Sequence, residues 1–238
     1  MKAVEVRELV KDYGKFRAID GISFEVNEGE IFGLIGPNGA GKTTALRVVA
    51  TLLQITAGSV SVFGYQLPQE AGEVRKIISY LPEEAGAYKN LTGREYLNFI
   101  AKFFSEGEEF ENMVRRGFEI SDLGERIDDK VDTYSKGMAR RLLVGRALMV
   151  NPRLAILDEP TSGLDVVNAQ EVRKIINDSV AGGVVVLLSS HNMLEVELLC
   201  HRIALIDNGR IVAGGTAAEL KREYDARNIE EAFVRAIQ

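Results

Sequence analysis

The sequence predicts an α/β fold: a core with a mostly parallel sheet, an N-terminal antiparallel β part and an inserted helical segment. Three observations predict it. Apolar residues alternate at period two in the opening third, and one continuous apolar run there leads into a glycine-rich loop and a helix-period segment. Later, two more apolar runs flank an amphipathic segment, an arrangement typical of a right-handed β-α-β crossover between parallel strands.

The first element group is the antiparallel β part. Apolar side chains alternate with polar ones at residues 4–6, 22–26 and 60–62, and turn residues such as Gly14 and Gly29 separate these runs. Alternation of this kind indicates strands with one exposed face. We therefore expect half-exposed, mostly antiparallel strands here.

A strand, loop and helix unit is embedded among them. The apolar run Glu30–Ile35 predicts a more buried strand, and a glycine-rich loop follows it. The next apolar residues recur at helical spacing. They are Ala45, Val48, Val49 and Leu52.

Residues 86–150 predict a helical subdomain. Its apolar residues recur at helical spacing, and Arg140, Arg141 and Arg146 alternate with leucines toward its end. We expect one helical face to carry four of the early apolar side chains. They are Leu97, Ile100, Ala101 and Phe104.

The α/β core resumes after residue 150. Strands are predicted at Leu154–Leu157 and Val184–Leu188, with a helix over Val167–Val180 between them. Asn208-Gly209 then marks a hairpin, because both residues tolerate positive φ; its arms are Ile203–Ile206 and Arg210–Val212. Glu219–Arg227 predicts a surface helix.

These boundaries divide one domain of residues 1–238 into subdomains. Residues 1–85 and 151–220 form the α/β core with its antiparallel part, 86–150 the helical subdomain, and 221–238 a C-terminal helical tail. The sequence contains no internal repeat and no low-complexity linker.

Composition limits the possible partners and compartment. The 238 residues carry a net charge of −6, which argues against nucleic acid as the main partner, because binding phosphates needs clustered Lys and Arg. One cysteine, Cys200, cannot form an internal disulfide, and no Cys or His cluster resembles a zinc site. We expect a reducing cytoplasm and a buried, inert Cys200.

No segment predicts a signal peptide or a membrane span. Met1–Val10 alternates charged and apolar residues, and the run Val184–Leu188 is far shorter than the roughly 20 residues that a spanning helix needs. A membrane function would therefore require a separate chain.

The glycine-rich loop matches the full phosphate-binding P-loop pattern in its required context, after an apolar strand and before an amphipathic helix. Its backbone N–H groups and the helix N-terminus would bind phosphate, Lys42 would reach the β- and γ-phosphates, and Thr43 would bind Mg²⁺. Thr44 is expected at the α-phosphate. A glycine-rich turn without ligand is the alternative. The loop consists of Gly36, Pro37, Asn38, Gly39, Ala40, Gly41, Lys42 and Thr43.

An apolar strand ends in two adjacent acids, Asp158 and Glu159. Placing two carboxylates there is costly, and catalysis gives a reason for it. Asp158 would hold Mg²⁺, while Glu159 would polarise the water that attacks the γ-phosphate. A solvated acid pair at a strand end is the alternative.

With these motifs in place, the whole chain resembles the ABC ATPases. The segment Tyr134–Met138 looks like the signature sequence of that family, from which Lys136 and Met138 depart. The resemblance implies that the signature residues bind the γ-phosphate of ATP held by a second copy, so that two ATP molecules lie between two subunits. Taken alone, Ser135 is a good helix N-cap. The signature residues are Ser135, Lys136, Gly137 and Met138.

Further segments resemble the same family. A segment of four residues that follows the acid pair looks like the D-loop, which in that family joins the two sites across the dimer. His191 resembles the switch histidine that contacts the γ-phosphate, and Tyr13 the aromatic residue that stacks on adenine. Their alternatives are a Ser-Gly turn, a structural histidine and ordinary packing. The D-loop residues are Ser162, Gly163, Leu164 and Asp165.

One position departs from the family pattern. Glu83 stands where the family usually has a glutamine, and a carboxylate binds Mg²⁺ or water but donates no hydrogen bond unless protonated. We expect Glu83 near the metal. Tyr80–Glu84 together with the signature resembles the branch that serves ABC-2 type exporters.

The resemblance implies a function: ATP hydrolysis with Mg²⁺ powers transport, in the export direction for this branch, through a separate membrane permease. A head-to-tail homodimer would close on ATP at the cytoplasmic face of the membrane. We expect the permease to contact Ala85, Ala87, Tyr88 and Leu91.

Two alternatives remain. One is a soluble ABC ATPase of nucleic-acid repair or of the ribosome, disfavoured by the single cassette, the acidic balance and the absence of sustained heptads. The other is a nucleotide-binding regulator without turnover, disfavoured by Glu159 and His191.

Overall fold

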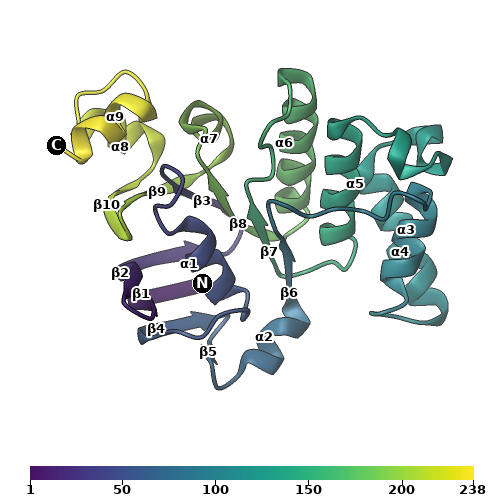
Figure 1. Ribbon diagram of the computed structural model, residues 1–238, viewed down its shortest axis with the longest axis horizontal. Helices are drawn as coiled ribbons and strands as arrows, with labels where there is room; N and C mark the ends of the chain where they lie inside the picture. Colours follow the sequence, from purple (N-terminus) through teal and green to yellow (C-terminus); the bar gives the residue numbers. More distant parts are fainter.

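The computed structural model describes residues 1–238 and contains two sheets side by side, with helices around them (Figure 1). A six-stranded sheet has the order β10-β9-β3-β8-β7-β6, and only the β9–β10 pair in it is antiparallel. The predicted mostly parallel α/β core is therefore confirmed. Its strands are β3 (Ile31–Ile35), β6 (Ile78–Leu81), β7 (Leu154–Asp158), β8 (Val185–Ser190), β9 (Arg202–Asp207) and β10 (Arg210–Gly215).

Strand β3 explains why its sequence is a continuous apolar run. All five of its residues are buried. Ile31 and Ile35 belong to a core of 34 buried residues on one face of the sheet, whereas Phe32 and Leu34 belong to a core of 26 on the other. Because neighbouring side chains point to opposite faces, a strand covered on both faces must be apolar at every position.

The second sheet is the predicted antiparallel part, with the order β2-β1-β4-β5. Helix α1 contacts strands of both sheets, and α2 lies beside β5 and β6 (Figure 1). Its buried residues, such as Val4 and Val6, contribute to the 26-residue core. The elements are β1 (Lys2–Tyr13), β2 (Phe16–Asn27), β4 (Ala57–Val62), β5 (Tyr65–Leu67), α1 (Lys42–Val49) and α2 (Ala71–Ile77).

Three helices form the part of the molecule at the right of Figure 1. The first begins with a capping box in which Thr92 and Glu95 exchange hydrogen bonds, and Ser135 caps the third. Both caps satisfy backbone N–H groups that a helix N-terminus leaves free. The helices are α3 (Gly93–Ala101), α4 (Gly107–Ser121) and α5 (Lys136–Leu148), with short 3₁₀ turns at Gly124–Asp128 and Val131–Thr133.

The remaining helices connect or follow strands of the parallel sheet. Helix α6 links the neighbouring parallel strands β7 and β8, as the β-α-β pattern predicted. Asn208 and Gly209 both have positive φ in the turn between β9 and β10, so the hairpin prediction is also correct. The helices are α6 (Val166–Ala181), α7 (Met193–Leu199), α8 (Ala217–Glu223) and α9 (Ile229–Ala236).

Two residues predicted on helical faces lie beyond the helices. Leu52 and Phe104 follow the ends of α1 and α3 and are 59% and 62% exposed. After Ala101 the chain tightens, because the N–H of Phe103 bonds to the carbonyl of Ile100 in a three-residue turn. Apolar spacing in the sequence therefore continues past the last residues of both helices.

The C-terminal prediction also needs correction. A single surface helix over Glu219–Arg227 was expected, but α8 ends at Glu223 and a second helix follows. Asp225 has a positive φ of 49°, which interrupts the helical conformation of the backbone. Ile229 and Phe233 of α9 are buried in the 34-residue core, so this tail packs against the domain.

None of the helices combines the length and the apolar composition that crossing a membrane requires.

Candidate functional site

The glycine-rich loop lies between β3 and α1, as predicted, and two of its glycines are required by close contacts. A Cβ on Gly36 would overlap the carbonyl oxygen of Ile206, and one on Gly41 would lie 2.7 Å from the carbonyl oxygen of Ala18. Gly41 also has a φ of 104°, which L side chains rarely adopt. The loop is thus held close to neighbouring backbone. The N–H groups of Gly36 and Ala40 donate to protein carbonyls, and the other N–H groups of the loop remain for a ligand.

Lys42 is buried at the base of this loop with an exposure of 5%. Its ammonium group donates to the carbonyl oxygens of Gly36 and Pro37 at 2.7 and 3.1 Å. The Nζ atom also lies 3.4 Å from Oε1 of Glu159. The lysine predicted to reach phosphate is therefore positioned directly beside the predicted base.

Asp158 accepts three side-chain hydrogen bonds at the end of β7. Its Oδ1 accepts from Ser189 at 2.6 Å and from Thr43 at 3.1 Å, and its Oδ2 accepts from Tyr80 at 3.3 Å. The contact with Thr43 joins two of the three residues predicted at Mg²⁺, and the third, Glu83, lines the cavity described below. A hydroxyl and a carboxylate oxygen suit Mg²⁺, which prefers oxygen ligands.

Glu159 is 4% exposed and carries two marks of a functional site. Its φ is 50°, in the left-handed region, and its Oε1 makes no hydrogen bond although it is buried. Native proteins leave few buried polar atoms unsatisfied, and strained backbone often lies at active sites. Its Oε2 contacts Nδ1 of His191 at 2.8 Å, so the structure brings the predicted base and switch histidine together.

A cavity of about 390 Å³ lies in front of these groups. Tyr13 and Phe16 flank its mouth on the β1–β2 hairpin, where they are cross-strand partners. Tyr13 is 45% exposed, so it is not an interior packing residue. The cavity is lined by Tyr13, Phe16, Ala18, Asn38, Gly39, Gly41, Lys42, Thr43, Thr44, Glu83 and Glu159.

The signature residues do not line this cavity. Ser135 caps α5, its hydroxyl accepting from the N–H of Met138 at 3.2 Å, which agrees with the structural alternative for this residue. The signature instead lies against the D-loop of its own chain. Lys136 occupies the space where a Cβ on Gly163 would be, and Asn168 the space beside Gly137.

The D-loop residues connect the acid pair to α6. Asp165 caps that helix by accepting from the N–H of Asn168 at 3.0 Å, and Ser162 donates its N–H to the carbonyl of Glu159 at 3.2 Å. Ser162 and Leu164 line a smaller cavity of about 290 Å³ together with Lys136. None of the four predicted D-loop residues reaches the nucleotide cavity.

Sequence reasoning missed several residues of the site. Ser189 and Arg140 contact the acid pair only through the tertiary fold, and no motif marks them. Tyr80 belongs to the segment Tyr80–Glu84 named above, but nothing in the sequence predicted its hydrogen bond to Asp158. Phe16 could have been found, because it follows the Gly14 turn opposite Tyr13.

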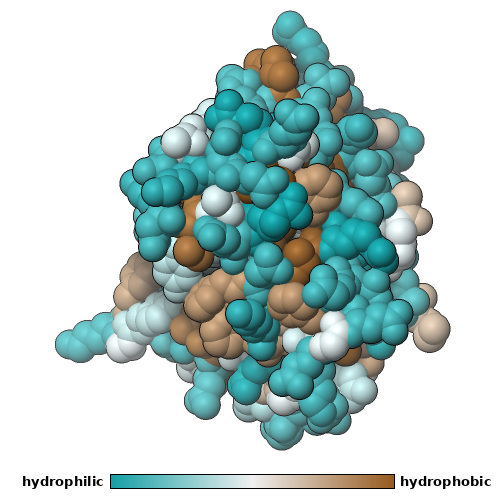
Figure 2. Space-filling view, turned by 90° about the vertical axis from the view of Figure 1, so that its right-hand side faces the viewer, coloured by the Kyte–Doolittle hydropathy of each residue, from teal (hydrophilic) through white to brown (hydrophobic).

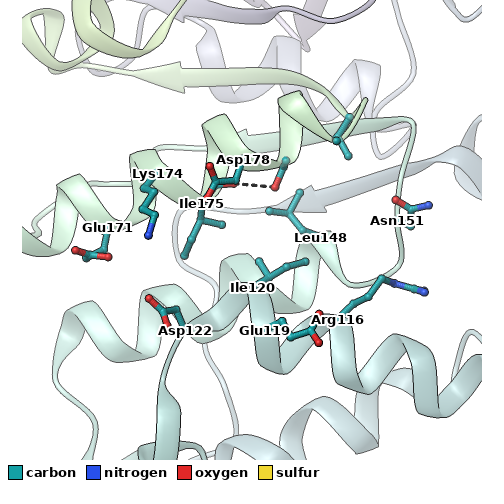
Figure 3. A pocket seen from close by; sticks show the side chains of 13 residues that line it. Arg116, Glu119, Ile120, Asp122, Leu148, Asn151, Glu171, Lys174, Ile175 and Asp178 are labelled. Carbon is teal, nitrogen blue, oxygen red and sulfur yellow. Dashed lines mark hydrogen bonds between the residues drawn. The ribbon is translucent and has the colours of Figure 1, made fainter.

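A second cavity of about 510 Å³ lies between α4, α5 and α6 (Figure 3). Charged side chains of both signs surround it, including Arg116, Glu119, Lys174 and Asp178. It contains none of the predicted site residues, so the chemistry resides in the smaller cavity.

Comparison with known proteins agrees with the motifs. The family model described as ABC transporter matches residues 19–162. The chain belongs to the ABC transporter family. It is therefore an ATP-binding subunit with ATPase activity, as the resemblance implied.

Relatives in the ABC transporter family include ATP-binding proteins named for drug resistance. The Bacillus subtilis (strain 168) linearmycin resistance ATP-binding protein LnrL is 36% identical over 99% of this chain and 78% of its own length. The Streptomyces peucetius daunorubicin/doxorubicin resistance ATP-binding protein DrrA is 40% identical over 92% of this chain and 67% of its own.

Solved structures of the family have the same fold. The ATP-binding subunit of an ABC transporter superposes with a TM-score of 0.86 and 29% identity, covering 99% of this chain and 100% of the other. The ADP conformation of the ABC transporter cassette MJ1267 gives 0.82 and 26%, covering 97% and 98%.

Proposed function

We propose that this chain hydrolyses ATP with Mg²⁺ to power export through a separate membrane permease, at the cytoplasmic face of the membrane. The observation that carries the proposal is that Lys42 and Glu159 meet at one cavity, and that Thr43, which also lines it, donates a hydrogen bond to Asp158. LnrL and DrrA are named as resistance ATP-binding proteins. Since removing a drug from the cell gives resistance, these names support export of a small molecule as the function.

Each group of the cluster has a task in phosphoryl transfer. Thr43 and Asp158 would hold Mg²⁺, which neutralises charge on the phosphates when bound, and Glu83 faces the same cavity. Lys42 would leave the carbonyl oxygens of the loop for the phosphate oxygens. Tyr13 offers its ring at the mouth for adenine.

Glu159 is the residue that we assign as the base. Its Oε1, which makes no hydrogen bond, can accept a proton or orient a water, and His191 holds the other oxygen. Their direct contact fixes the carboxylate in one orientation, which matters because positioning dominates phosphoryl transfer. His191 is 44% exposed at its side chain, so it can also meet the γ-phosphate.

A second copy would complete the site. Ser135 and Lys136 are exposed and lie outside the nucleotide cavity of their own chain, at the N-terminus of α5. A helix N-terminus favours anions, so this end suits the γ-phosphate of ATP on a second copy. A dimeric solved structure of an ATP-binding cassette bound to ADP and phosphate has the same fold, at a TM-score of 0.78.

The permease would dock on the helical part of the molecule. Three aromatic rings there stack edge to face in a row, at centroid distances of 5.5 Å for Tyr88–Phe99 and 5.2 Å for Phe99–Phe103. Tyr88 and Phe103 are 55% and 70% exposed. Large exposed apolar groups of this kind mark interaction surfaces.

This aromatic row refines the expected contacts. Of the four residues predicted to meet the permease, only Tyr88 is exposed; Ala85, Ala87 and Leu91 pack against the core. Helix α3 lies on the side of the molecule that Figure 2 faces, where apolar side chains gather among polar ones. We therefore place the docking surface on Tyr88, Phe99 and Phe103.

Crosslinking tests the docking surface, since buried Cys200 leaves the chain without an accessible thiol. Phe103→Cys should crosslink to the permease in membranes. Leu198→Cys, 74% exposed on α7, is the matched control and should not. Crosslinks from Leu198→Cys alone would place the permease on another face.

The experiment that tests the whole proposal is size-exclusion chromatography with light scattering on Glu159→Gln. With ATP and Mg²⁺ the mass should rise from the 26.2 kDa of one chain to that of a dimer, because a chain that cannot hydrolyse ATP stays closed. Adding Lys42→Ala should abolish the shift. Wild-type hydrolysis by Glu159→Gln would reject this residue as the base.

A further inference from the structure

Arg140 of α5 is a buried cation that no sequence motif of the site includes. It is 7% exposed, and all four hydrogen bonds of its guanidinium go to backbone carbonyl oxygens. Burial holds the pKa of Arg140 below its usual value, against the opposing charges of Glu83, Asp158 and Glu159. Burying such a group is expensive, so its four bonds call for an explanation.

The four carbonyl groups belong to two loops at the nucleotide cavity. One bond of 3.1 Å reaches the carbonyl of Glu83, in the loop after β6. The other three reach consecutive peptides after β7: Asp158 at 3.3 Å, Glu159 at a short distance and Pro160 at 2.7 Å. A single guanidinium thus binds the peptide planes on both sides of Glu159.

These bonds act on the strained turn described above. Glu159 has a φ of 50°, a conformation that is unfavourable for an L residue. The carbonyls of Asp158 and Glu159 belong to the peptide planes before and after the Cα atom of Glu159. Holding both planes fixes the φ and ψ of Glu159, and therefore the direction in which its carboxylate points. The planar fork of Arg has five N–H donors that can reach several carbonyls at once, which the single ammonium of Lys cannot.

Arg140 also belongs to the helix that starts at the signature segment. It lies about 7.5 Å along α5 from Ser135, at 1.5 Å per residue. A displacement of the helix N-terminus moves Arg140 with it, because an α-helix this short behaves as a rigid body. The guanidinium therefore connects the signature end of the chain to the turn of its own Glu159.

We propose that Arg140 is a positioning residue: it holds the turn that carries Glu159 and transmits movement of α5 to that carboxylate. This inference rests on the proposed role of Glu159 as the base. In a closed dimer, contact of one copy's ATP with α5 of the other would thereby align the Glu159 of the chain that α5 belongs to.

The test compares ATP hydrolysis by Arg140→Met, Arg140→Lys and Arg141→Met. Arg140→Met should lower kcat by about 10- to 100-fold and change KM for ATP by less than about twofold, since misplacing a catalytic group costs rate more than binding. Arg140→Lys should recover part of the loss. Arg141→Met is the matched control, because Arg141 donates to the carbonyl of Asp122, away from the site.

Two outcomes overturn the inference. The first is a kcat for folded Arg140→Met within about twofold of wild type, and the second is a rise in KM that accounts for the loss in kcat/KM. If Arg140→Met does not fold, Arg140→Lys decides: a reduced kcat at unchanged KM supports the inference, and a wild-type kcat overturns it. Glu159→Gln, measured beside them, tests the base itself, because wild-type hydrolysis in that variant rejects the proposed function whatever Arg140 does.

Discussion

Replacing Ser189 by Ala tests whether Asp158 is held as a buried carboxylate. Ser189 is completely buried, and its hydroxyl donates to Oδ1 of Asp158 at 2.6 Å while accepting from the N–H of Glu159 at 3.0 Å. A hydrogen bond to a charged group contributes roughly 1.5–3 kcal/mol, and the Glu159 N–H keeps a second acceptor, the Ser189 carbonyl at 3.2 Å. We expect the free energy of unfolding to fall by about 2 kcal/mol.

Urea denaturation measures this loss, which should also lower Tm by about 4–8 °C for a chain of this size. Ser121→Ala is the matched control. Ser121 is equally buried, but its hydroxyl donates only to the carbonyl of Phe118 in its own helix, at 2.9 Å. The control should lose less than about 1 kcal/mol. Equal losses in both variants would refute the claim that Ser189 stabilises an ionised Asp158.

Three further predictions follow from the site and its surroundings. Gly36→Ala should abolish ATP binding and lower the free energy of unfolding by more than about 2 kcal/mol, because its Cβ overlaps the Ile206 carbonyl; Gly72→Ala in α2, where a Cβ meets no atom within 4 Å and φ is not positive, should keep wild-type binding in the same fluorescent-nucleotide titration. Cys200 should react with Ellman's reagent only after unfolding in urea, since burial raises the pKa of its thiol; reaction in native buffer would contradict this. Tyr13→Ala should raise the Kd for ATP and for GTP about fivefold each, from about 1 kcal/mol of stacking, and an unchanged Kd for both would exclude the stacking role.

The fold could be predicted where local patterns and burial agree. The continuous apolar run of β3 predicts a buried strand, and the turn Asn208-Gly209 predicts a hairpin. The structure contains both. The ends of α1 and α3 could not be predicted from spacing alone. Apolar residues such as Leu52 and Phe104 continue the period beyond the last residues of α1 and α3, because nothing in a periodic pattern records where tertiary packing stops.

The residues of the site also fall into a predictable and an unpredictable group. The P-loop is one contiguous segment and the acid pair is another, so a motif of a few residues predicts the local geometry of each. Ser189 and Arg140 contact the acid pair from β8 and α5, and their contribution depends on strand order and helix packing. A buried hydroxyl and an arginine in a basic helix look like ordinary residues until the sheet brings them to Asp158.

The backbone conformation and the hydrogen bonding of Glu159 indicate why the acid pair lies at this end of the sheet. Glu159 combines a left-handed φ with a buried oxygen that lacks a hydrogen bond, and both features destabilise the folded chain without ligand. Lys42 lies 3.4 Å from that oxygen, but its ammonium group donates its hydrogen bonds to the loop carbonyls. Under the proposed function, phosphate entering the loop would offer Lys42 a stronger, charged acceptor, and a water held between that phosphate and Glu159 would satisfy the remaining oxygen. Substrate binding would therefore relieve the unsatisfied oxygen of the proposed base but not its left-handed φ, as expected of a site selected for turnover and not for the stability of the empty protein.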